Sequence, residues 1–126
     1  MSLECRLHLS LDPVAAFRGL RDSAAPEPVA VALLAELAGV RFVSMEARDQ
    51  RRARDVRLLR ETLSVPVDLA LAPTLDPVGT AFEVRPDRLT LVPEQREGGS
   101  AAGGLDAHLL RDALKKHVTH LRDAEI

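Results

Sequence analysis

The chain has 126 residues, of which 17 are Lys or Arg and 19 are Asp or Glu, so its formal net charge is −2. Its only aromatic residues are three Phe, and 46% of all residues are hydrophobic. These values predict a single globular domain over residues 1–126. They argue against both a basic field for polyanions and an aromatic platform for nucleic acid.

The single cysteine, Cys5, cannot form a disulfide within the chain, which fits a reducing compartment. No apolar run reaches the ~18 residues of a membrane span, and the start MSLECRLHLSLD lacks the basic and apolar parts of a signal peptide. We therefore expect a cytoplasmic protein with no membrane contact, and we assign Cys5 to the hydrophobic core.

Strands and helices are predicted to alternate along the chain. The segment CRLHLSLD alternates strictly and predicts a first strand over residues 5–12, with its leucines on one face. Apolar runs of similar length predict three more strands, at 41–47, 67–72 and 88–94. Helical periodicity predicts helices at 13–21, 28–40, 51–63, 75–84 and 105–124.

Particular residues define the ends and faces of these helices. Pro28 opens the second helix and Gly39 closes it. The third helix should bury one side, formed by Val56, Leu59 and Leu63. The last helix should bury the side formed by Leu105, Leu109, Ala113 and Leu121.

Four βα units in series predict a parallel α/β sheet with right-handed helical crossovers. Such a (β/α)4 unit is either half of a (β/α)8 barrel, with its helices outside, or a small open sheet. The strands alternate only partly, so one face of the sheet is less apolar than a doubly wound sheet requires. This pattern favours the half-barrel.

Ligands of βα proteins meet the carboxyl ends of the strands. Polar side chains gather there, mostly carboxylates and guanidiniums with two hydroxyls: Ser10, Asp12, Glu46, Arg48, Asp49, Arg51, Arg52, Thr74, Glu94, Arg96 and Glu97. Arginine suits phosphate oxygens, so these ends suggest a small phosphorylated ligand, and the Gly-rich stretch 98–104 is typical of a cover over a site. The alternative is that ARDQRRARD is only the solvated start of a helix.

Histidines give a weaker signal. His117 and His120 stand three residues apart on the last helix and could share a metal, but no complementary ligand joins them, which favours a solvated helix surface. His8 is expected to be half-buried in its strand. We expect no metal and no cofactor.

Four segments follow one another in a specific order: LSLDPVAAFRGLRDSAAPEPVAVALLAELAGV, ARDQRRARDVRLLRETL, EVRPDRLTLVPEQRE and GGLD. Together they resemble the pyridoxine 5′-phosphate synthase family. The family is a (β/α)8 barrel, and the resemblance covers only its first half. It implies condensation of 1-deoxy-D-xylulose 5-phosphate with 3-amino-2-oxopropyl phosphate, a step of vitamin B6 biosynthesis.

The resemblance also implies substrate-binding residues near the first strand. The family has Asn-x-Asp-His there, and this chain reads Ser10-Leu11-Asp12-Pro13. Asp12 is therefore kept, Ser10 is a weaker substitute, and the His is lost to Pro13. Arg21 matches the family's arginine for the aminoketone phosphate.

The later strands match the family only in part. The family's His-x-Arg reads Glu46-Ala47-Arg48, which implies Glu46 as the catalytic proton acceptor and Arg48 as a ligand of the pentulose phosphate. Ala70 replaces the family's general-base Glu. Ser100 stands in place of a loop Thr that contacts the sugar phosphate.

A half-barrel with two bare edges and an apolar inner face should associate. We expect a homo-oligomer or a complex with a complementary half-barrel. Three functions stay open: an active synthase that needs a partner, a degenerate relative that binds a phosphorylated metabolite with weak or no turnover, and a structural or interaction half-barrel. The second is favoured, because two acid–base residues are missing while several binding residues remain.

Overall fold

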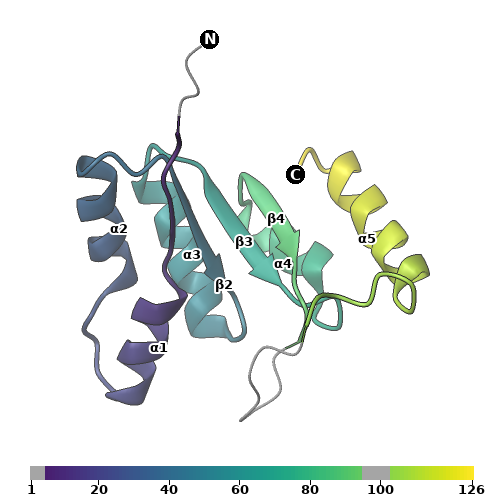
Figure 1. Cartoon of the computed structure of the whole chain (residues 1–126), viewed down its shortest axis with the longest axis horizontal. Coiled ribbons are helices and arrows are strands. Elements are labelled where there is room, and N and C mark those ends of the chain that lie inside the picture. The colour runs from purple at the N-terminus through teal and green to yellow at the C-terminus, as the bar shows by residue number, and fades with distance from the viewer. Residues whose placement is uncertain (1–4, 95–102) are drawn as a thin grey trace.

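The chain is described here by a computed structural model that covers residues 5–94 and 103–126. Within these ranges strands and helices alternate as predicted (Figure 1): β1 (His8–Ser10), α1 (Asp12–Leu20), α2 (Pro28–Leu37), β2 (Phe42–Glu46), α3 (Gln50–Thr62), β3 (Val67–Leu71), α4 (Pro77–Val84), β4 (Arg88–Leu91) and α5 (Arg111–Asp123).

The four strands form one parallel sheet in the order β1-β2-β3-β4. The register pairs Ser10 with Ser44, Ser44 with Asp68, and Asp68 with Arg88. Each strand thus pairs with the next one along the chain. The predicted α/β class and (β/α)4 order are confirmed.

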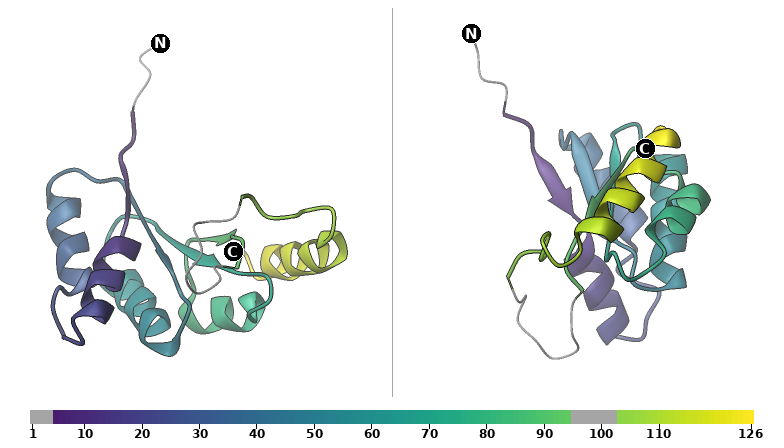
Figure 2. Two further views of the ribbon diagram at one scale, coloured as in Figure 1. Left: turned by 60° about the horizontal axis from the view of Figure 1, so that its bottom comes forward. Right: turned by 90° about the vertical axis from the view of Figure 1, so that its right-hand side faces the viewer.

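One face of the sheet carries the hydrophobic core. Behind it lie α3 and α4, with α1 and α2 beside them and α5 next to α4 (Figures 1 and 2). The predicted side of α3 is buried against this face, which supplies Val43, Met45, Val67, Leu69 and Leu71. Burial of these apolar side chains is the main force that holds the helices on the sheet.

Local signals fix the helix ends. Pro28 begins α2, and Gly39 follows that helix with φ of 101°, a conformation that L side chains rarely adopt. Asp49 caps α3 by accepting a hydrogen bond from the Arg52 backbone N–H at 2.9 Å. The cap fixes the first turn of α3 beside the carboxyl end of β2.

The opposite face of the sheet is polar, so the predicted apolar inner face is wrong. No helix in the described part of the chain lies over it (Figure 2). By the register, this face carries His8, Ser10, Phe42, Ser44, Glu46, Asp68, Ala70, Arg88 and Thr90. Side chains alternate along a strand, so when Val43, Met45, Val67 and Leu69 face the helices, their polar neighbours must face away.

Three smaller predictions are also wrong. Cys5, in the segment before β1, is exposed rather than in the core. His8 is exposed rather than half-buried because it lies on the face of β1 that no helix in the described part of the chain covers. The last helix begins at Arg111, not at 105. Asp106 accepts hydrogen bonds from the backbone of His108 and Leu109 and holds a separate turn there, where Leu109 is 79% exposed. Ala113 is exposed as well, so of the predicted buried side only Leu121 is buried.

Candidate functional site at the carboxyl ends of β1 and β2

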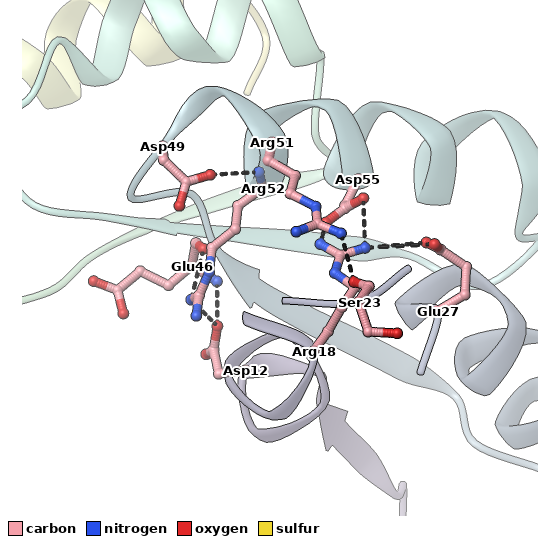
Figure 3. Close-up of polar contacts among 9 residues, drawn as sticks. All are labelled: Asp12, Arg18, Ser23, Glu27, Glu46, Asp49, Arg51, Arg52 and Asp55. Carbon is pink, nitrogen blue, oxygen red and sulfur yellow. Dashed lines mark hydrogen bonds and ion pairs between the residues drawn. The ribbon is translucent and has the colours of Figure 1, made fainter. Parts of the chain in front are cut away.

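Asp12 and Glu46 lie together where β1 and β2 end (Figure 3). Asp12 is the first residue of α1, and its Oδ1 accepts a hydrogen bond from the Glu46 backbone N–H at 2.8 Å. Ser10 donates its hydroxyl to Asp12 Oδ2 at 3.2 Å. These contacts tie the start of α1 to the neighbouring strand and fix the direction of the Asp12 carboxylate.

Two guanidiniums complete this cluster. Arg48 donates from Nε and Nη2 to Glu46 Oε2, at 2.8 and 2.7 Å. Arg52 reaches from the first turn of α3, with its Nη1 3.5 Å from Asp12 Oδ1 and 3.4 Å from the Glu46 carbonyl oxygen. Arg48 is 41% exposed and Arg52 only 12%, so Arg48 is the arginine that meets solvent. We call Ser10, Asp12, Glu46, Arg48 and Arg52 the rim cluster.

A buried ion pair lies beside the rim cluster (Figure 3). Arg18 of α1 and Asp55 of α3 form a two-donor pair, and their side chains are only 3% and 6% exposed. Glu27, just before α2, also accepts from Arg18, at 3.4 Å. The hydrogen bond with Asp55 raises the pKa of the Arg18 guanidinium, which keeps it charged. The pair fastens α1 to α3 and thereby holds Asp12 near Arg52.

A third carboxylate, that of Asp68 in β3, lies on the polar face close to the rim cluster. It is 7% exposed and accepts hydrogen bonds from the Thr90 hydroxyl at 3.0 and 2.9 Å. Burial raises the pKa of the Asp68 carboxyl, against the opposing effect of the Thr90 bond. In the register, Ala70 pairs with Glu46 and with Thr90, so a methyl group stands between them.

The structure brings together four of the six site residues named from the sequence: Ser10, Asp12, Glu46 and Arg48. Arg21 lies at the other end of α1, about 13 Å along the helix from Asp12 at ~1.5 Å per residue, where its guanidinium is 5.6 Å from the Phe17 ring. Ser100 lies outside the described residues.

Arg52 is the member of the rim cluster that the sequence did not single out from its neighbours. The sequence could have indicated Arg52 by its place three residues after Asp49, which caps α3. Side chains in the first turn of a helix lean toward the helix start, which here lies at the carboxyl end of β2. Sequence reasoning also missed the Arg18–Asp55 pair, whose partners are 37 residues apart.

Paired carboxylates and guanidiniums at a strand end can bind an anion and accept a proton. Both bonds from Arg48 reach Glu46 Oε2, which leaves Oε1 as the acceptor oxygen. Arg48 and Arg52 present donors that suit phosphate oxygens. In residues 5–94 and 103–126, no group of three or more His, Cys, Asp or Glu could hold a metal, and no helix is long and apolar enough to cross a bilayer.

The fold and the rim cluster define an α/β protein of the (β/α) barrel class with a polar site at the strands' carboxyl ends. A family model described as "Pyridoxal phosphate biosynthesis protein PdxJ" matches residues 7–126. The chain belongs to this family, and the expected resemblance is confirmed.

Curated relatives carry the name pyridoxine 5′-phosphate synthase. The one from Syntrophotalea carbinolica is 43% identical over 123 residues, which cover 95% of this chain and 52% of the relative. The one from Aquifex pyrophilus is 40% identical over 124 residues, covering 96% and 52%. The chain spans about half the length of the curated relatives it matches, so it carries half of their (β/α)8 barrel.

Proposed function

We propose that the chain is the phosphate-binding half of a pyridoxine 5′-phosphate synthase-like protein and that it has weak or no turnover alone. The observation that carries this proposal is the rim cluster, in which Asp12 and Glu46 are held with two arginines at the strand ends. The ligand we propose is 1-deoxy-D-xylulose 5-phosphate, as the family resemblance implies.

Each member of the cluster has a proposed role. Arg48, the more exposed arginine, binds the sugar phosphate, while Arg52 neutralises Asp12 and donates a hydrogen bond to the Glu46 carbonyl oxygen. Asp12 and Ser10 accept or share hydrogen bonds with the sugar hydroxyls. Glu46 accepts a proton through Oε1 while Oε2 stays on Arg48.

Weak turnover follows from the residues at two positions. Pro13 and Ala70 offer no proton acceptor where the family has a His and a Glu. Loss of one acid–base group typically lowers the rate by ~10² to 10⁴. The chain keeps the proposed binding residues Asp12 and Arg48 although it lacks these two acid–base residues. This combination favours a relative that binds a phosphorylated metabolite. We further propose that the half-barrel, as one domain, closes with a second half along β1 and β4.

The test is thermal or urea unfolding with and without 1-deoxy-D-xylulose 5-phosphate. A ligand at 100 times its Kd should stabilise the fold by about 2.7 kcal/mol. Arg48→Ala should remove this gain, whereas Arg54→Ala, an exposed arginine on the same helix as Arg52, should retain it. No gain with the unaltered chain would favour the alternative, a structural half-barrel that binds no metabolite.

A further inference from the structure

The sheet carries a second group of cations, at the end opposite the rim cluster. A hollow of about 540 Å³ opens there, and the side chains that line it include Arg6, His8, Arg41, Phe42, Asp87 and Arg88. His8, Phe42 and Arg88 are the first residues of their strands, so we call it the amino-end hollow. Phe42 and Glu46 begin and end β2, which separates the hollow from the rim cluster by about 13 Å at ~3.3 Å per residue.

Arg88 is held at the wall of this hollow by an aromatic ring. Its guanidinium carbon lies 4.4 Å from the centroid of the Phe42 ring, and the same ring meets His8 edge-on, with centroids 4.8 Å apart. The ring orders the arginine without using up its N–H donors. Asp68 attracts the guanidinium, but its two oxygens accept from the Thr90 hydroxyl. Within residues 5–94 and 103–126, no group accepts a hydrogen bond from the Arg88 side chain.

Arg41 supplies a second guanidinium from the residue just before β2. Its backbone N–H donates to the Leu7 carbonyl oxygen at 3.0 Å, which fixes the residue between β1 and β2. Its side chain is exposed and makes no hydrogen bond or ion pair with the described residues. Arg6 has a partner of its own. In the described part of the chain, the arginines of the hollow that remain available to a ligand are therefore Arg41 and Arg88.

The carboxylate that lines the hollow does not cancel these charges. Asp87 accepts a hydrogen bond from the Val67 backbone N–H at 2.8 Å and lies 3.4 Å from Arg60 Nε. Arg60 is not among the lining residues, so the charge of Asp87 is balanced from outside the hollow. The hollow therefore keeps an excess of positive charge, and a concave surface with charges of one sign attracts counter-ions from solution.

We propose that the amino-end hollow is a second anion-binding site, separate from the rim cluster, which takes a small phosphorylated molecule by its phosphate group. Arg41 and Arg88 each offer a fork of two parallel N–H donors. One fork suffices for a carboxylate, whereas a phosphate ester brings three oxygens and nearly two charges, which two forks match. The volume of the hollow lies within the ~300–1,000 Å³ of small-molecule sites, which leaves room for the organic part of an ester.

This site goes beyond the proposed function, since it requires neither the rim cluster nor turnover. An NMR titration of the whole chain with inorganic phosphate, at constant ionic strength set with sodium chloride, tests it. The backbone amide signals of Arg41, Phe42 and Arg88 should shift and reach saturation. Arg41→Gln should weaken this binding roughly tenfold, because it removes one of two charge-assisted forks. Arg54→Gln, an equal loss of charge at an exposed position of α3, should leave the Kd unchanged.

The same spectra report the rim cluster separately, through the amides of Glu46 and Arg48. Arg48→Ala should remove the shifts at the rim and leave those at the hollow, so the two sites can fail independently. A repeat with 1-deoxy-D-xylulose 5-phosphate distinguishes the source of the phosphate: a lower Kd than that of inorganic phosphate identifies an ester as the ligand, and an equal Kd identifies free phosphate.

Three results would overturn the second site. The first is a shift at Arg41, Phe42 and Arg88 that does not saturate. The second is an unchanged Kd in Arg41→Gln, and the third is an equal loss in Arg54→Gln, which would indicate a general effect of charge. Because the amide spectrum also shows whether each variant is folded, a loss of binding is not mistaken for a loss of structure.

Discussion

The carboxylate of Asp12 accepts a hydrogen bond from the backbone N–H of Glu46 at 2.8 Å, so the first residue of α1 is hydrogen-bonded to the last residue of β2. This contact joins two consecutive βα units at their carboxyl ends. It also explains why Asp12 is useful to the fold whether or not a substrate is present, because a partly buried N–H without a partner is costly.

Asp12→Ala should destabilise the chain by about 1–3 kcal/mol, since the Glu46 N–H loses its acceptor. Asp12→Asn should cost less, because the amide oxygen can still accept that bond. Urea unfolding of both variants measures the difference. Equal losses would mean that the charge opposite Arg52, rather than the hydrogen bond, is what stabilises this end of the sheet.

Arg18→Ala should destabilise the chain by about 3–5 kcal/mol, because it leaves the Asp55 carboxylate buried without its partner. Arg18→Met combined with Asp55→Leu should recover most of the loss, since an apolar pair of similar volume needs no compensating charge. The matched control is Arg57→Ala, which breaks the exposed Arg57–Glu83 pair and should cost about 0–1 kcal/mol. If the two alanine variants unfold at the same urea concentration, the Arg18–Asp55 pair does not anchor α1.

Asp68→Asn should stabilise the chain near neutral pH and much less in acid. Burial raises the pKa of Asp68 in the folded state, so its favourable contribution is complete below the unfolded value of ~3.9 and is lost as pH rises through the folded pKa. Asn keeps an oxygen for the Thr90 hydroxyl and carries no charge to desolvate. Melting curves across this pH range should show that the stability gained by Asp68→Asn grows as pH rises. A gain that shrinks with rising pH would contradict a pKa of Asp68 raised by burial.

Gly39→Ala should destabilise the chain by about 1–3 kcal/mol, because φ of 101° is strained for any residue with a Cβ. Gly19→Ala is the control: it lies within α1, has open space for a Cβ, and should gain about 0.5–1 kcal/mol from higher helix propensity. Both values come from the same thermal or urea unfolding experiment. Opposite signs for the two variants are the expected result, and a loss at both positions would contradict the reasoning for α1.

What the sequence determined by itself is local. Alternation and helical periodicity predicted the order of strands and helices, Pro28 and Gly39 bounded α2, and Val56, Leu59 and Leu63 marked the buried side of α3. The family and the half-barrel also followed from motifs in the chain. The strands, the helices and their buried sides depend on residues a few positions apart, whose relative placement is decided within one strand or helix.

The tertiary structure decided which of these elements meet, and at which residues. It joined Arg52 to Asp12 across 40 positions and Arg18 to Asp55 across 37, and it left Arg21 at the far end of α1. It also showed that the inner face is polar, because only the pairing of strands tells which residues of different strands share a face. Such contacts depend on register between distant segments, and no periodicity within one segment encodes that register.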